Sequence, residues 1–125
     1  MPDAATAKRI LVVDDDLTQV KLLQGLLTQN NYTPIITTAA PDGLNIAMNE
    51  PVDLVILDVM MPIINGYNFC RLLKTQKKSI PIILVTSRDE ADDLKIGQEM
   101  GADGYLTKPV NTAELLKEIK RLLGS

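Results

Sequence analysis

The sequence has no histidine, no tryptophan and a single cysteine, Cys70, among its 125 residues. Without an imidazole, the chain cannot build the zinc sites or the serine and cysteine triads that depend on histidine. A lone cysteine forms no internal disulfide, which is typical of a reducing cytosol, so we expect a cytoplasmic protein in which Cys70 is a small packing residue. No apolar run approaches the roughly 18 residues that a membrane span needs, so we expect no association with a membrane.

Basic charge is scarce as well. Lysine and arginine number 13 against 16 aspartates and glutamates, which gives a net charge of -3. Because such a field repels phosphate backbones, we predict that this chain does not bind nucleic acid directly. Residues 1–7 lack the apolar core of a signal peptide and are expected to form a flexible tail. Residues 8–124 contain no repeat or linker and are enough for one domain with its own core.

Strand and helix patterns alternate along the chain. Apolar and β-branched runs predict strands at residues 10–13, 34–38, 54–57, 81–85 and 105–107. Helical spacing predicts helices at 17–29, 41–49, 89–100 and 112–123, and a further helix that follows the Asn65-Gly66 turn, contains Phe69, Leu72 and Leu73 and ends near residue 76. Five strands alternating with five helices through short connections predict a doubly wound α/β fold with a parallel sheet. The second and fifth strands are the most polar or shortest, so we place them at the edges, in the order 2-1-3-4-5.

Three carboxylates follow two strands that are neighbours in this order. Asp14 and Asp15 come directly after the first strand, and Asp58 comes directly after the third, where Pro62 forces the chain to turn. The carboxyl ends of the first and third strands meet at the switch point of the sheet, where such folds bind ligands. Three carboxylates there would repel one another unless a cation offset them. Because only oxygen ligands are on offer, we predict a Mg²⁺ site.

A hydroxyl and a cation reach the same edge. Thr86 follows the fourth strand and Lys108 follows the fifth. A group of acids that binds a metal, with a cation and a hydroxyl donor above it, suits the binding of a tetrahedral dianion such as a phosphoryl group. Asp58 would then be the carboxylate that attacks phosphorus. Taken alone, Lys108 would be a solvated surface lysine and Thr86 a turn residue, and Asp16 is better explained as a helix cap. The convergence of the other groups on one edge favours the functional interpretation.

These motifs resemble a known family. The segments 10–16 (ILVVDDD), 54–62 (LVILDVMMP) with Asn65-Gly66, 85–87 (VTS) and 104–109 (GYLTKP) together are similar to the receiver domain of two-component response regulators, a flavodoxin-like fold. The resemblance extends from Arg9 to Leu123. It implies that Asp58 accepts a phosphoryl group from the phosphohistidine of a histidine kinase or a histidine phosphotransfer protein.

The resemblance also implies roles for the residues around Asp58. Asp14, Asp15, Asp58 and the main-chain carbonyl of Met60 would hold Mg²⁺, while Thr86 and Lys108 would contact the phosphoryl oxygens. An inward movement of Thr86 would let Tyr105 turn from exposed to buried, which is the switch of this family. The bond between Lys108 and Pro109 is expected to be cis.

The two residues that tune access of water in such domains are here Met60 and Arg88, and neither is an obvious activator of water. We therefore predict slow self-hydrolysis of the phosphorylated form.

Two helices carry further hypotheses. The leucines of the helix at 17–29 spread over a wider arc than a surface helix needs, so some are expected to face outward. They either cover a broad core or form a surface that docks a partner. The helix at 89–100 has few inner apolar residues and contains Gly97, which costs it about 1 kcal/mol relative to alanine, so we expect it to be the least anchored.

The expected function is signalling without catalytic turnover. The sequence ends soon after its last helix, so we expect a single-domain regulator, a monomer or weak dimer, that acts through a downstream effector protein. A phosphorelay shuttle to a histidine phosphotransfer protein is the alternative within the same family. An aspartate-nucleophile phosphatase is a remote alternative, because Met60 stands where that class requires a second acid. A degenerate receiver that acts only as a scaffold is disfavoured by the complete set of acids, hydroxyl and lysine.

Overall fold

The computed structural model describes residues 7–61, 64–87 and 91–124, with the backbone alone for residues 91–94. The strands are β1 Arg9–Val13, β2 Thr33–Thr37, β3 Leu54–Asp58, β4 Ile82–Thr86 and β5 Gly104–Thr107. The helices are α1 Leu17–Gln29, α2 Ala40–Asn49, α3 Gly66–Gln76, α4 Ala91–Glu99 and α5 Thr112–Leu123. Most of the predicted tail, residues 1–6, lies outside the described residues.

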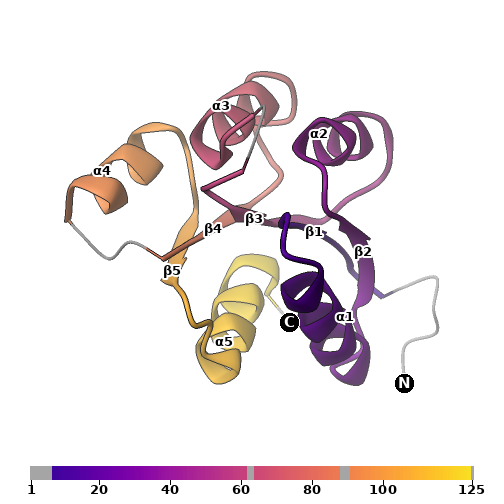
Figure 1. Ribbon diagram of the computed structural model, residues 1–125. Coiled ribbons are helices and arrows are strands. Elements are labelled where there is room, and N and C mark those ends of the chain that lie inside the picture. The colour runs from indigo at the N-terminus through magenta and orange to yellow at the C-terminus, as the bar shows by residue number, and fades with distance from the viewer. Residues whose placement is uncertain (1–6, 62–63, 88–90, 125) are drawn as a thin grey trace.

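The strands form one parallel sheet in the order β2-β1-β3-β4-β5. This confirms the predicted doubly wound α/β fold and its strand order. In Figure 1, α1 and α5 cover one face of the sheet and α2, α3 and α4 cover the other. Val13 is the register partner of Leu57, so the residues that follow β1 lie beside the end of β3. The carboxyl edge therefore brings together the segments that the sequence placed there.

The sheet separates two apolar cores, because successive residues of a strand point to opposite faces. The core under α2, α3 and α4 contains Leu11, Val13, Val55, Leu57, Phe69, Leu73, Ile82 and Leu84. The core under α1 and α5 contains Ile10, Val12, Val20, Leu23, Leu54, Ile56, Ile83, Val85, Leu115 and Ile119. The inner strands β3 and β4 are buried along their whole length, which explains why their sequences are continuous apolar runs.

Side-chain caps mark the start of three helices, α1, α3 and α5. The Asp16 carboxylate accepts hydrogen bonds from the backbone N–H groups of Thr18 and Gln19, at 3.0 and 3.4 Å, so the prediction that Asp16 caps α1 is confirmed. Asn65 and Asn111 cap α3 and α5 in the same way. These caps fix how each helix leaves the carboxyl edge of the sheet.

The observed strands differ slightly from the predicted ones. β2 begins at Thr33, so Pro34 is its second residue rather than its first. Pro34 is tolerated there because β2 is an edge strand, as predicted. β4 extends to Thr86, which is fully buried, so this residue belongs to the strand and not to the turn after it.

Two expectations about side chains are confirmed. Leu17 and Leu22 of α1 face outward, with exposed fractions of 54% and 58%, whereas Val20, Leu23 and Leu27 are buried. Cys70 is fully buried, and its thiol lies 3.4 Å from the carbonyl oxygen of Met100. Burial raises the pKa of the thiol to about 11, so the group packs as a neutral side chain. Among the described residues, no helix has the length and apolar character to cross a bilayer.

Candidate functional site

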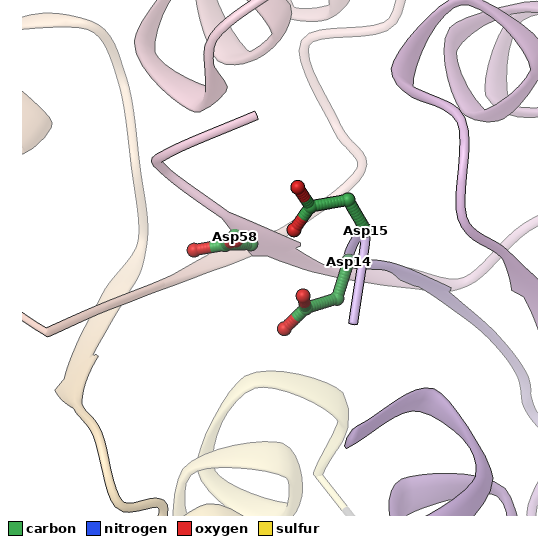
Figure 2. A group of neighbouring side chains, drawn as sticks. All are labelled: Asp14, Asp15 and Asp58. Carbon is green, nitrogen blue, oxygen red and sulfur yellow. The ribbon is translucent and has the colours of Figure 1, made fainter. Parts of the chain in front are cut away.

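Three aspartates meet at the carboxyl edge of the sheet. Asp14 and Asp15 follow β1, and Asp58 is the last residue of β3 (Figure 2). One carboxylate oxygen of each lies within 4.8 Å of those of the other two. Asp14 and Asp58 are buried, while Asp15 is exposed. The structure thus brings together the three carboxylates that the sequence predicted as metal ligands.

Burial of Asp58 makes its negative charge costly. Desolvation, followed by the charge of Asp14, raises the pKa of the Asp58 carboxyl from 3.8 to about 6. The charge of Lys108 and a hydrogen bond from the backbone N–H of Met60, 3.3 Å from Oδ1, act in the opposite direction but do not cancel the rise. The site therefore holds more negative charge than its own residues neutralise, which favours a cation.

Lys108 lies among these acids. Its Nζ is 3.0 Å from Oδ2 of Asp14 and 3.7 Å from Oδ2 of Asp58. Burial lowers the pKa of the ammonium, but the hydrogen bond to Asp14 and the charges of Asp14 and Asp58 outweigh it and raise the pKa overall. The backbone N–H of Lys108 donates to the carbonyl of Thr86 at 2.6 Å, and the bond to Pro109 is cis, as expected. The two ion pairs show that the amine points into the site rather than to bulk solvent.

The donor set fits Mg²⁺. All the side-chain ligands on offer are carboxylate oxygens, which hard divalent cations prefer. Asp14 is already held, because Oδ1 accepts a hydrogen bond from the backbone N–H of Asp16 at 2.9 Å and Oδ2 contacts Lys108. Exposure of Asp15 leaves one side of the group open to water, which Mg²⁺ usually retains. The fourth predicted ligand, the carbonyl of Met60, lies on the loop that follows Asp58 and stays a prediction.

Gly66 supports this loop, a role that sequence reasoning missed. Its backbone N–H donates to the carbonyl of Val59 at 2.8 Å. A Cβ at Gly66 would stand 2.6 Å from the Cα of Val59 and 2.7 Å from the carbonyl oxygen of Asp58. Only glycine lets the start of α3 approach the backbone of Asp58 and Val59 so closely. The Asn65-Gly66 pair was the available signal, but it indicated only a turn.

Thr86 and Tyr105 lie on the adjacent strands β4 and β5. Asp58 is the register partner of Val85, so Thr86 lies one residue beyond it, and Thr86 is fully buried. Tyr105 is the register partner of Leu84, and it is half-buried against the core that contains Leu84. Because alternate residues of a strand share a face, Thr86 and Leu84 point to the same side as Tyr105. Arg88 lies outside the described residues.

The family model described as the response regulator receiver domain matches residues 10–120. The chain belongs to this family. Among known proteins, this receiver domain is 40% identical over 116 residues to the alkaline phosphatase synthesis transcriptional regulatory protein PhoP of Bacillus subtilis. That match covers 93% of the chain and 48% of the relative. The receiver domain therefore spans about half the length of this curated relative.

Solved structures show the same fold. A CheY-like response regulator receiver domain protein from Methanospirillum hungatei has a TM-score of 0.90 and 30% identity, with 95% of each chain covered. The chemotaxis protein CheY4 of Vibrio cholerae has a TM-score of 0.88 and 28% identity, with 94% of this chain and 100% of that one covered. The receiver domain thus has a CheY-like, flavodoxin-like architecture.

Proposed function

We propose that Asp58 accepts a phosphoryl group, in a Mg²⁺-dependent reaction, from the phosphohistidine of a histidine kinase or a histidine phosphotransfer protein. A carboxylate oxygen of Asp58 would form a bond to phosphorus as the bond between phosphorus and the imidazole nitrogen breaks. The electron pair of that bond stays on the nitrogen, which then takes a proton from water. The observation that carries the proposal is the cluster of Asp14, Asp15 and Asp58 with the ammonium of Lys108 3.7 Å from Asp58.

Each residue of the cluster has a task in this reaction. Bound Mg²⁺ would neutralise the charge of the phosphoryl oxygens and of the carboxylates. Asp14, Asp15, Asp58 and the main-chain carbonyl of Met60 would hold that ion. Lys108 places a positive charge opposite the group that arrives on Asp58, and its contact with Asp14 keeps the amine in position before transfer.

The response is proposed to pass through Thr86 and Tyr105. Thr86 is buried one residue beyond the strand partner of Asp58, so its hydroxyl is well placed to respond to a phosphoryl oxygen. Tyr105 lies on the same face of the sheet, and its half-buried ring can report that movement at the surface. A downstream effector protein would recognise the altered face. The output is therefore a binding event, and we propose that the domain turns over no substrate as an enzyme.

The phosphodonor is proposed to dock on α1. This helix begins directly after the acidic segment and exposes Leu17 and Leu22. Beside Leu22, an open groove of about 340 Å³ is lined by Lys21, Leu22, Gly25, Leu26, Gln29 and Thr112. Exposed apolar side chains next to a groove are typical of a protein-binding surface. This favours docking over the alternative in which the leucines only cover the core.

A phosphorelay role remains the second candidate, in which Asp58 passes the group on to another histidine. It uses the same residues and differs only in the fate of the phosphoryl group. A phosphatase role is disfavoured, because the side chain of Met60 is exposed where a general acid would be needed. The proposals of a cytoplasmic location and of no direct nucleic-acid binding concern this receiver domain and rest on its composition and its net charge of -3.

The test is phosphorylation of the purified chain by acetyl phosphate with Mg²⁺, read by intact-mass spectrometry. Wild type is expected to gain one phosphoryl group, whereas Asp58→Asn and wild type in excess EDTA gain none. Equal labelling of wild type and Asp58→Asn would exclude Asp58 as the acceptor. Reverse transfer from the phosphorylated chain to a histidine phosphotransfer protein would identify a relay.

A further inference from the structure

Gly97 faces the sheet from the inner side of α4. The residue is buried, and a Cβ built on it would lie 3.2 Å from Cδ1 of Leu84. The same Cβ would lie 3.2 and 3.3 Å from Cδ2 and Cε2 of Tyr105. Contacts this short are rare for real side chains, so a side chain at position 97 would require the ring of Tyr105 or the side chain of Leu84 to shift by a few tenths of an ångström.

Tyr105 also lines a cavity. This cavity of about 270 Å³ is lined by Gln98, Ala102, Asp103, Gly104, Tyr105 and Glu118. Gly104 also lacks a side chain there, and a Cβ on it would stand 3.2 Å from a carboxylate oxygen of Glu118. Tyr105 therefore lies close to Gly97 and also lines a cavity into which its ring could move.

Helix propensity does not account for a glycine at this position. Glycine in the interior of a helix is less favourable than alanine, because it loses more backbone entropy on folding. Gly25 in α1 is a useful comparison, since nothing lies within 4 Å of a Cβ built there. The two glycines carry the same intrinsic penalty, but only at Gly97 would a Cβ meet a residue of the proposed switch.

We propose that Gly97 is the positioning residue for Tyr105, because its missing side chain admits the ring against α4. A side chain at position 97 would push the ring toward the cavity or move α4 away from β4 and β5. The position of α4 and that of the ring are then coupled, so a movement of either requires a movement of the other. The inference deepens the proposed function, because it rests on Tyr105 being part of the phosphorylation switch.

The experiment uses ¹⁹F NMR of the full chain labelled with 3-fluorotyrosine. The chain has three tyrosines, Tyr32, Tyr67 and Tyr105, and their signals are assigned with single Tyr→Phe variants. Spectra of wild type, Gly97→Ala and the matched control Gly25→Ala are recorded alone and with Mg²⁺ and beryllofluoride. We expect Gly97→Ala to shift the Tyr105 signal without ligand and to reduce its response to beryllofluoride, while Gly25→Ala changes neither.

A Tyr105 signal of Gly97→Ala that coincides with wild type in both states would overturn the proposal. If the Tyr105 signal of wild type did not respond to Mg²⁺ and beryllofluoride, the proposed function would be contradicted instead. The comparison of wild type and Gly97→Ala without ligand would still test the contact between position 97 and the ring. Urea unfolding gives a second, independent measurement. The midpoint of Gly97→Ala should rise more, or fall less, in a Tyr105→Ala background than in wild type. Equal midpoint changes in the two backgrounds would refute contact between position 97 and the ring.

Discussion

The ammonium of Lys108, which follows β5, reaches across the ends of β4 and β3 to contact Asp14, which follows β1, at 3.0 Å. The contact therefore joins the edge strand β5 to β1, which lies next to β2 at the opposite edge of the sheet. It neutralises a carboxylate that is 4% exposed and would otherwise be costly to bury. The same acid is a proposed metal ligand, so Lys108 and Mg²⁺ would both offset the negative charge of the aspartate cluster.

Replacement of Lys108 by methionine is expected to destabilise the metal-free protein. The free energy of unfolding should fall by roughly 1–2 kcal/mol, less than for a fully buried pair, because 26% of the lysine side chain is exposed. Urea unfolding in EDTA measures the change, and the loss should shrink when Mg²⁺ is added. Lys117→Met, at an exposed position of α5, is the control and should change stability by less than about 0.5 kcal/mol. If Lys108→Met lost the same unfolding free energy with and without Mg²⁺, Lys108 and Mg²⁺ would not offset the same negative charge.

Asp58 is expected to make the metal-free protein less stable as the pH rises. Its pKa is raised from 3.8 to about 6 in the folded state, so the folded protein binds more protons than the unfolded chain between these values. The contribution of Asp58 to stability therefore falls between about pH 4 and pH 6 and stays constant above. Asp58→Asn removes this cost and should be more stable than wild type by on the order of 1–3 kcal/mol at neutral pH.

The pH prediction is checked by urea unfolding of wild type and Asp58→Asn in EDTA at several pH values. The excess stability of the variant should shrink toward acid pH. It should also shrink at neutral pH when Mg²⁺ is added, because the ion offsets the charge of the wild-type carboxylate. A constant difference across the pH range would show that another effect of the substitution dominates.

Much of this site follows from local sequence patterns. The order of the strands could be predicted because strands buried on both faces have continuous apolar sequences, while β2 and β5 do not. The convergence of Asp14, Asp58 and Lys108 then follows from topology, since each lies at the carboxyl end of a strand of one parallel sheet.

The contacts between distant elements could not be predicted in the same way. The sequence indicated that some leucines of α1 face outward, but packing against α5 and the sheet decides that these are Leu17 and Leu22. Gly66 and Gly97 appeared as a turn marker and a weak point of a helix. Their importance lies in what a Cβ would meet, the backbone of Asp58 and the ring of Tyr105, and such distances depend on the folded positions of the elements.

Gly66→Ala is expected to weaken both folding and metal binding. The added methyl group overlaps the backbone of Asp58 and Val59, so the loop must move and the unfolding free energy should fall by roughly 1–3 kcal/mol. Displacement of the loop should also lower the affinity for Mg²⁺, measured by titration of the folded variant. Gly25→Ala is the matched control and should gain up to about 1 kcal/mol without a change in Mg²⁺ affinity. If folded Gly66→Ala bound Mg²⁺ as tightly as wild type, Gly66 would not be needed to shape the metal site.

Phosphorylated Asp58 is expected to lose its phosphoryl group slowly. Met60 is exposed beside the acceptor and carries no group that can take a proton from water. Loss of radiolabel from the purified phosphoprotein measures the rate, and complete loss within seconds would contradict this expectation. Met60→Asp places a carboxylate two residues after the acceptor and should speed the loss, whereas Met60→Leu should leave the rate close to that of wild type.

Leu22→Asp is expected to impair transfer from a protein donor but not from a small molecule. Leu22 is 58% exposed and lines the groove of α1, so a charge there should disrupt docking while the core and the acidic cluster stay intact. The initial rate of transfer from a phosphorylated histidine phosphotransfer protein should fall about tenfold or more, as for the loss of a contact worth about 1.4 kcal/mol. The rate with acetyl phosphate should stay that of wild type.

Leu72→Asp provides the matched control for this surface. Leu72 is also an exposed leucine, with a fraction of 40%, but it lies on α3, across the sheet from α1 (Figure 1). It should therefore leave transfer from both donors unchanged. Equal loss of protein-donor transfer in both variants would assign the effect to added negative charge rather than to the α1 surface. Loss of acetyl phosphate labelling by Leu22→Asp would instead place its effect on the acceptor site itself.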